Sequence, residues 1–311
     1  MGTPDFAVMP LKALVENGYN VIGVVTMPDK PAGRGQKMQE SAVKQYAVEA
    51  GLKVLQPEKL RDPGFISELQ ALEPDLGIVI AFRMLPEMVW AMPKLGTFNL
   101  HASLLPQYRG AAPINWAIIN GETETGVTTF MLNAEIDKGA VIGQREMAID
   151  EVETAGVLHD KLMAVGTELV LDSVEKIASG DITPVEQSRF ETHKLKEAPK
   201  IFKETGRIDW NQPIETTYNL IRGLSPYPAA WSELVNPQGQ RLNVKVFSAD
   251  KQSISPDHVP GTILSDGKSF LKAASHDGYI GIEELQLAGK KRMSVADFLR
   301  GFNNITDWRF E

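Results

Sequence analysis

The sequence predicts an α/β domain with a doubly wound, mostly parallel sheet, followed by a small antiparallel β-barrel. Three observations lead to this prediction. Short apolar runs alternate with amphipathic segments through the first half of the chain. A long helical pattern over residues 154–180 ends that alternation. After residue 224, short alternating runs are separated by Gly, Pro, Asn and Asp, a pattern typical of antiparallel strands.

Each element follows from its own pattern. In the first half, the buried runs predict strands at residues 20–26, 52–56, 75–81, 97–101 and 126–132. The segments between them open at Asp, Ser or Pro and several close at Gly, which predicts helices. In the last third, a helix over residues 213–224 precedes strands expected at 229–235, 242–249, 261–265 and 278–288.

These elements group into two domains. Residues 1–180 are expected to form the α/β domain and residues 200–311 the β-barrel. The polar, unpatterned residues 181–199 are expected to link them. One feature departs from the usual architecture, because only "MGTP" precedes the first helix and no strand opens the sheet. Either the domain starts unusually, or an apolar segment belongs before Met1.

The residue composition and the net charge exclude several classes of protein function. The chain has 311 residues, 43% of them hydrophobic, and no cysteine, which excludes disulfides, a thiolate nucleophile and thiolate-bound metals. It shows neither a membrane-spanning run nor a signal peptide, so a cytoplasmic protein without membrane contact is expected. The net charge of −8 argues against nonspecific nucleic-acid binding. However, 14 Lys and Arg face 13 Asp and Glu in residues 200–311, so the C-terminal third tolerates a polyanion better.

Asn99 and His101 are the first candidate site residues. They are two positions apart at the end of a predicted strand, so both side chains lie on one face. That edge of a parallel sheet is where ligands bind. Asp137 precedes another strand entry, and an Asn, His and Asp set suits stabilisation of an oxyanion with proton transfer. Taken alone, the pair also fits a core histidine beside an asparagine that ties down a loop.

Two basic segments are candidates for phosphate contacts. Arg34 and Lys37 lie in "GRGQK", which lacks the spacing of a phosphate-binding loop and equally fits a solvated surface loop. Lys290, Lys291 and Arg292 are adjacent in the expected barrel, where they form either a solvated face or a contact with a nucleic-acid backbone. No GxGxxG followed by an acidic residue occurs, so a nicotinamide dehydrogenase is set aside.

At "NLHASLLPQYRGAAPI" the chain resembles the folate-dependent formyltransferase family, whose hallmark is Asn-x-His, a Ser-Leu-Leu-Pro loop and a distant Asp-x-Gly. These positions are Asn99, His101, residues 103–106 and Asp137 with Gly139. The segments "GTPDFA", "PDKPAGRGQK", "RIDW", "PYPAAW" and "LQLAGKKRMSVADFLRG" are similar to the branch that formylates methionyl-tRNA. The resemblance covers nearly the whole chain and implies a Rossmann-like domain followed by an OB-like barrel.

The resemblance also implies an activity. The formyl group of N10-formyltetrahydrofolate would pass to the α-amine of initiator methionyl-tRNA for translation initiation, without a metal. Asn99, His101 and Asp137 would be catalytic. The residues expected to line the folate site are Ser103, Leu104, Leu105, Pro106, Ile80, Phe82 and Leu85. The residues expected to contact tRNA are Arg34, Lys37, Lys290, Lys291 and Arg292.

Two alternatives stay open from the sequence. The same Asn, His and Asp set would serve a formyltransferase that acts on a sugar nucleotide or another amine. A truncated, non-catalytic copy that binds folate or RNA is the second alternative, and the absent first strand is its main support. A monomer is expected in either case. In the family a strand precedes "GTPDF", whereas this sequence begins at that loop.

Overall fold

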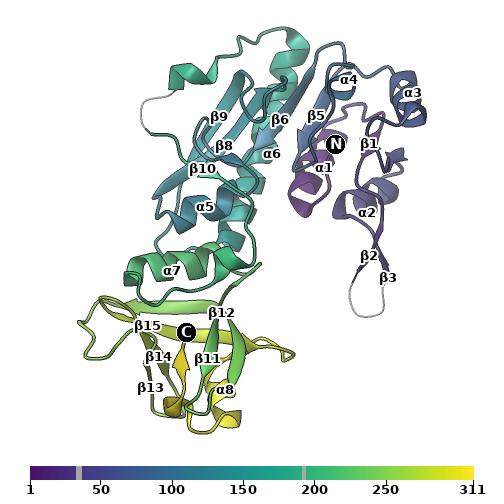
Figure 1. Ribbon diagram of the computed structural model, residues 1–311. Coiled ribbons are helices and arrows are strands. Elements are labelled where there is room, and N and C mark those ends of the chain that lie inside the picture. Colours follow the sequence, from purple (N-terminus) through teal and green to yellow (C-terminus); the bar gives the residue numbers. More distant parts are fainter. Residues whose placement is uncertain (33–36, 191–193) are drawn as a thin grey trace. The chain divides into compact units, whose positions relative to one another are not determined.

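The computed structural model describes residues 1–32, 37–190 and 194–311, and the chain divides into two compact units (Figure 1). The first unit comprises Met1–Gly110, Thr125–Met147 and His159–Glu197. The second comprises Ala111–Glu124, Ala148–Leu158 and Ala198–Glu311. The two short internal segments therefore belong with the C-terminal residues. The functional division at residues 180 and 200 stays a prediction.

Helices α2 and α3 of the N-terminal half begin at a side-chain cap. Ser41 accepts a hydrogen bond from the Lys44 backbone, and Asp62 accepts one from Phe65, so each satisfies an amide that the first turn leaves unpaired. The helices up to residue 179 are η1 (Asp5–Ala7), α1 (Val8–Glu16), α2 (Ala42–Glu49), α3 (Pro63–Ala71), α4 (Glu87–Trp90), α5 (Pro113–Ile119) and α6 (Ala155–Ser179).

Four strands form the main sheet of the first unit, in the order β5-β6-β8-β9. Strands β5 and β6 are parallel, whereas β6 and β8 are antiparallel. The predicted α/β fold is confirmed, with a mixed sheet. The strands up to residue 198 are β1 (Val24–Val25), β2 (Lys30–Ala32), β3 (Lys37–Gln39), β4 (Val54–Leu55), β5 (Gly77–Ile80), β6 (Thr97–His101), β7 (Arg109–Gly110), β8 (Glu124–Met131), β9 (Val141–Ala148) and β10 (Glu197–Ala198).

Met1 and Gly2 lie between β1 and β5, where a sheet of this kind has a central strand. The Gly2 amide donates to the carbonyl of Val25, at 3.0 Å. On the other side, the Ile80 amide donates to the Met1 carbonyl and the Met1 amine donates to the Ile78 carbonyl. Burial lowers the pKa of that amine to about 5. Met1 and Gly2 thus bond to backbone groups on both sides of this position.

The second unit is built around an antiparallel sheet, as predicted. Its strand order is β13-β14-β15-β12-β11-β17, with β16 paired to β15. A bridge between Thr262 and Arg309 joins the two ends of this order and nearly closes the barrel. The strands are β11 (Ala230–Val235), β12 (Arg241–Gln252), β13 (Ile263–Ser265), β14 (Leu271–Ala274), β15 (Tyr279–Leu287), β16 (Met293–Ser294) and β17 (Arg309–Phe310).

Helices cover the barrel of the second unit and share its core. Helix α7 buries Ile214, Tyr218 and Ile221 in one cluster with residues of the strands. Helix α8 adds Phe298 and Leu299 to the same cluster. The helical elements after residue 180 are η2 (Gln187–Phe190), η3 (Glu204–Gly206), α7 (Ile214–Gly223), α8 (Val295–Gly301) and η4 (Ile305–Asp307).

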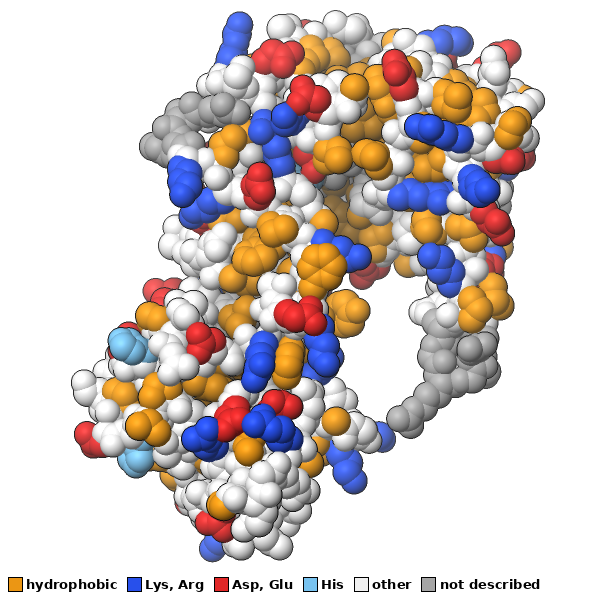
Figure 2. All heavy atoms as spheres, in the orientation of Figure 1, with side chains coloured by type: hydrophobic (Ala, Val, Ile, Leu, Met, Phe, Trp, Pro, Cys, Tyr) orange, Lys and Arg blue, Asp and Glu red, His pale blue; other side chains and the backbone are white. Residues whose placement is uncertain are grey.

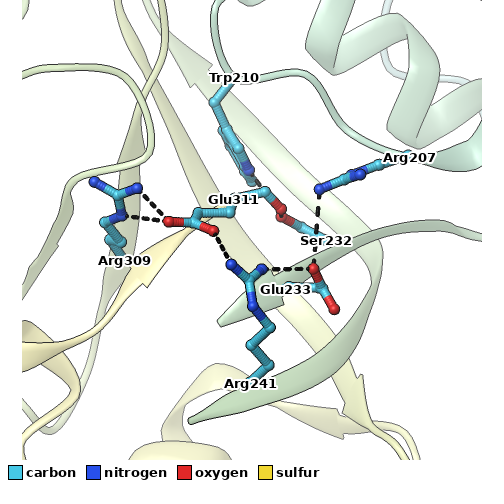
Figure 3. Close-up of polar contacts among 7 residues, drawn as sticks. All are labelled: Arg207, Trp210, Ser232, Glu233, Arg241, Arg309 and Glu311. Carbon is cyan, nitrogen blue, oxygen red and sulfur yellow. Dashed lines mark hydrogen bonds and ion pairs between the residues drawn. The ribbon is translucent and has the colours of Figure 1, made fainter. Parts of the chain in front are cut away.

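Ion pairs attach the C-terminal residues to the barrel (Figure 3). The guanidinium of Arg241 donates to Glu233 at 2.9 Å and to Glu311 at 2.7 Å, and Arg309 donates to Glu311. The hydroxyl of Ser232 donates to the Glu311 carbonyl. The hydrogen bonds from Arg309 and from Arg241 lower the pKa of the Glu311 side chain. Strand β17 is therefore held by side chains as well as by its ladder.

Candidate functional site

Strand β6 presents Asn99 and His101 on one face of the sheet. Leu100, between them, points the other way toward α6, where a Cβ on Gly166 would lie 2.9 Å from the leucine side chain. Leu100 is therefore packed against a helix that must approach closely. The alternation of the strand leaves Asn99 and His101 on the opposite face, as the sequence predicts.

His101 is buried, with 6% of its surface exposed, and its ring has a defined orientation. The Nε2 atom lies 2.8 Å from the carbonyl oxygen of Tyr108. Because a carbonyl only accepts, Nε2 carries a proton in this hydrogen bond. Tyr108 has a φ of 59°, which places it in the left-handed region. The chain after the Ser-Leu-Leu-Pro loop thus turns sharply to meet the histidine.

Asn99 differs from His101 in its polar contacts. Its Oδ1 atom is buried and has no hydrogen-bond partner in the described part of the chain. Buried polar atoms are nearly always paired, so an unpaired one is a candidate for contact with a ligand. The side chain as a whole is half-buried. This amide fits the expected role at the site of a polar substrate.

Asp137 lies in the turn between β8 and β9. Its Oδ2 atom accepts a hydrogen bond of 3.1 Å from the Gly110 amide. No hydrogen bond between Asp137 and His101 occurs among the described residues. Instead, the two side chains contact the same short segment, His101 at Tyr108 and Asp137 at Gly110. The structure therefore links His101 and Asp137 through residues 108–110.

The loop at residues 103–106 is held from β8 and β9. Thr128 donates to the carbonyl of Ser103 at 2.6 Å and accepts from the Leu105 amide. Gln144 donates both to Thr128 and to the Leu105 carbonyl. The side chains of Ser103, Leu105 and the following proline are buried, whereas that of Leu104 is half-buried. The side chains of Thr128 and Gln144 therefore attach this loop to β8 and β9.

The segment after β5 holds the other residues expected at the folate site. Ile80 and Leu85 are buried, and Phe82 is half-buried beneath the guanidinium of Arg83. Between them, Ala81 has a φ of 47°. Figure 2 shows hydrophobic side chains gathered on this unit around β5, where the surface is hollowed. Exposed apolar residues of the unit include Met84, Met88, Leu95 and Ile136.

The basic residues expected at the tRNA fall into three groups. Arg34 lies outside the described residues, and only the backbone of Lys37, in β3, is described. Lys290 and Lys291 are exposed in the turn between β15 and β16. Arg292 pairs with Glu284 and lies 4.6 Å from the centre of the Phe247 ring. The two lysines are therefore more accessible to phosphate than Arg292.

Four residues of this region were not predicted from the sequence. Thr128 and Gln144 hold the loop at 103–106, and Arg109 and Gln187 hold the turn of Asp137. Thr128 and Gln144 lie in strands, where nothing distinguishes them from ordinary polar positions. Arg109 follows the Ser-Leu-Leu-Pro loop, and that position is the one signal that could have found it. Gln187 lies in the segment expected to be a linker.

The described residues contain no cluster of three or more His, Cys, Asp or Glu side chains arranged to hold a metal ion. They also contain no helix long and apolar enough to span a membrane. The polar groups that the site does present are an amide, an imidazole and a carboxylate. Together these groups can donate a hydrogen bond to a developing oxyanion and accept a proton.

Comparison with known proteins adds to this geometry. Residues 1–174 match the family described as formyl transferase, and residues 200–303 match the formyl transferase C-terminal domain. The chain is 57% identical to methionyl-tRNA formyltransferase of Parabacteroides distasonis, over 99% of this chain and 96% of the relative. It is 59% identical to methionyl-tRNA formyltransferase of Phocaeicola vulgatus, over 97% of this chain and 94% of the relative.

A solved structure shares the fold. It is the N-formyltransferase of Helicobacter canadensis in complex with folinic acid and dTDP-3-aminofucose. The TM-score is 0.63 at 19% identity, and the match covers 94% of this chain and 97% of that chain. At this identity the likeness concerns the arrangement of elements alone.

Proposed function

Since this chain belongs to the methionyl-tRNA formyltransferase family, we propose that it transfers the formyl group of N10-formyltetrahydrofolate to the α-amine of initiator methionyl-tRNA. The product is N-formylmethionyl-tRNA, which is used in translation initiation. The observation that carries this proposal is 57–59% identity to relatives of that name over nearly the whole chain, both units included. The support for a sugar formyltransferase is a likeness of fold to solved structures at 16–25% identity.

The chemistry is addition to a carbonyl followed by elimination. The amine nitrogen attacks the formyl carbon and the carbonyl oxygen becomes an oxyanion. The oxyanion then re-forms the carbonyl, the bond from that carbon to N10 breaks, N10 takes up a proton, and tetrahydrofolate leaves. The Asn99 amide donates a hydrogen bond to the oxyanion, and the protonated His101 ring donates a second one from Nδ1, because its Nε2 is bonded to the Tyr108 carbonyl. Asp137 accepts the proton of the attacking amine through a water molecule. It acts together with His101, and the two side chains contact the same segment, residues 108–110.

The formyl donor is expected to lie along the face of β6, beside the loop at 103–106 and the segment 79–86. The unpaired oxygen of Asn99 fits a polar ligand at this position. The rigid backbone of the loop can read the donors and acceptors of a pterin ring, and the hollowed apolar surface can cover it. The folinic acid in the H. canadensis structure is a ligand of the same chemical class.

The tRNA is expected to meet the basic residues. Lys290 and Lys291 are exposed. Arg34 and Lys37 both lie in the sequence "GRGQK". Arg292 is expected to support this turn through its pair with Glu284 while facing the same phosphates. We propose a monomer that works in the cytoplasm, where aminoacylated tRNA is used.

One assay tests the proposal. The purified chain is mixed with N10-formyltetrahydrofolate and either initiator methionyl-tRNA or an amino-sugar nucleotide, and the formylated product is measured. Formyl transfer to the tRNA alone is the expected result. Transfer to the sugar alone would replace the proposed acceptor. Transfer to neither, by a chain that melts cooperatively, would support a non-catalytic copy.

A further inference from the structure

Gln187 is a buried polar residue in a segment whose composition predicts a linker. Only 2% of its surface is exposed. It begins η2, two residues after Val185 forms a two-way backbone bridge with Val141 at the start of β9. The segment is thus attached to the sheet at the point where the chain enters β9. This placement brings Gln187 to the turn that carries Asp137.

The amide of Gln187 connects two parts of the site. Its Oε1 atom accepts from Arg109 Nε at 3.0 Å and Nη2 at 2.6 Å. Its Nε2 atom donates to the carbonyls of Asp137 and Gly139, both at 2.9 Å. All the hydrogen-bonding capacity of the amide is therefore used. Arg109 Nε also donates to the Asp137 carbonyl. The side chains of Arg109, Asp137 and Gln187 therefore all bond β7 to the turn.

The turn that Gln187 holds is strained. Asp137 has a φ of 53°, a region that non-glycine residues rarely adopt. Two residues on, a Cβ at Gly139 would lie 1.6 Å from the Met131 carbonyl, so the chain passes too close there for any side chain. A strained conformation persists only where its surroundings determine it. The two bonds from Gln187 to the carbonyls of this turn are such a determinant.

We propose that Gln187 is a positioning residue that fixes the carboxylate of Asp137 for proton transfer. This inference rests on the proposed function, because it concerns the role of Asp137 in formyl transfer. Gln187 holds the backbone of Asp137, and Asp137 Oδ2 then meets the Gly110 amide beside Arg109. Loss of the amide would release the turn and displace the carboxylate, while Asn99 and His101 stay in place on β6.

Two variants test the hydrogen-bond acceptor and the hydrogen-bond donor of the Gln187 side chain. Gln187→Met keeps the approximate volume and removes every hydrogen bond. Gln187→Glu keeps an acceptor for Arg109 and removes the donor to the carbonyls of Asp137 and Gly139. Both variants are expected to lower kcat about 10- to 100-fold, as loss of supporting contacts does elsewhere. The KM for methionyl-tRNA is expected to stay within about two-fold, because the binding surfaces are unchanged.

The second unit offers a matched control. There Asn219 accepts a hydrogen bond from Arg222, which donates to the Glu153 carbonyl, so another buried amide and arginine hold a backbone segment. Asn219→Leu is expected to lower the melting temperature as much as Gln187→Met does, but to leave kcat within about two-fold. Equal losses of kcat in the two variants would show that Gln187 has a general structural role and would overturn the proposal.

A double-mutant cycle tests whether Gln187 acts through Asp137. In an Asp137→Asn background, Gln187→Met is expected to cause little further loss of kcat, because the group that it positions is already inactive. Additive losses would overturn the proposal.

A measurement without substrate keeps the inference distinct from the proposed function. Hydrogen exchange of the Gly110 amide reports its bond to Asp137 Oδ2. Exchange is expected to be faster in Gln187→Met and Gln187→Glu, and unchanged in Asn219→Leu. Unchanged exchange in both Gln187 variants would overturn the inference even if the wild-type chain is active. Faster exchange in a chain inactive toward tRNA would support the positioning and refute the proposed acceptor.

Discussion

Asn99 and His101 lie in the same strand but differ in the hydrogen-bond partners of their side chains. The His101 ring is paired with a carbonyl, whereas the Asn99 oxygen is buried without a partner among the described residues. An unpaired buried polar group costs about 1–3 kcal/mol of folding stability. A fold carries such a cost most readily where function uses the group. The asparagine is therefore the clearest mark of a ligand site at the residue scale.

Replacement of either side chain should separate activity from stability. Asn99→Ala and His101→Ala are each expected to lower kcat about 10²- to 10³-fold, because each removes a donor to the oxyanion. Both chains should fold, and Asn99→Ala should melt close to the wild type, since no bond of the Asn99 oxygen is lost. Formyl transfer and thermal melting are measured on the same preparations.

The control for this experiment is His258→Ala, which removes a histidine of the second unit that contacts Tyr279. Its turnover is expected to match that of the wild type. Wild-type turnover in Asn99→Ala or in His101→Ala would refute the catalytic role of the residue that was replaced.

At the scale of elements, the unusual feature is the position between β1 and β5, where Met1 and Gly2 lie. Met1 and Gly2 make only the last bonds of a strand between β1 and β5. Gly2 is required there, because a Cβ would lie 2.6 Å from that of Ala7. The Met1 amine is buried among backbone groups, which disfavours its charged form and lowers its pKa to about 5. In a chain that starts at Met1, the stability of this region is therefore expected to depend on pH.

The direction of that dependence follows from proton binding. In a chain that starts at Met1, the unfolded amine binds a proton below its ordinary pKa of 8.0, but the folded amine does so only below about 5. Between these values the unfolded state holds more protons, so the free energy of unfolding is expected to rise with pH from about 5 to about 8. Urea unfolding across this range measures the slope.

A chain extended upstream by several Val and Ile residues supplies the comparison. The extension moves the amine away and continues the strand between β1 and β5, so the slope is expected to shrink and the melting temperature to rise. An extension of equal length made of Gly and Ser controls for the displaced amine alone. An identical slope in all three chains would contradict a buried amine.

At the scale of the whole molecule, charge has to be reconciled with a polyanionic partner. The net charge is −8, which opposes approach to tRNA at long range. The excess of acid lies in residues 1–199, whereas residues 200–311 are nearly balanced. Local cations can therefore bind phosphate within a screening length of about 8 Å at physiological salt. Lys290 and Lys291 are exposed cations of this kind.

Reversal of these two charges should weaken tRNA binding. The double variant Lys290→Glu with Lys291→Glu is expected to raise the KM for tRNA at least about 10-fold at physiological salt and to leave kcat unchanged, because phosphate contacts bind without taking part in the chemistry. The dependence of KM on salt should also become less steep. Lys268→Glu, at another exposed turn of the barrel, serves as the control. An unchanged KM would contradict a role of this turn.

Local sequence determined the elements and the strand-end pair. Strand alternation alone put Asn99 and His101 on one face, and caps such as Ser41 and Asp62 begin helices where the sequence predicts them. Turn residues between short alternating runs gave the antiparallel barrel of the second unit. These features depend on contacts within a few residues, which a single sequence displays.

The tertiary structure decided what depends on distant contacts. It made the sheet mixed through the antiparallel pair of β6 and β8. It also linked His101 to Asp137 through residues 108–110 instead of directly. Gln187 is 50 residues from Asp137 in the chain, and its buried side chain is polar, so neither spacing nor hydrophobic pattern distinguishes it from a linker residue. The sequence by itself therefore determined the reactive groups, and only the folded chain decided what holds them.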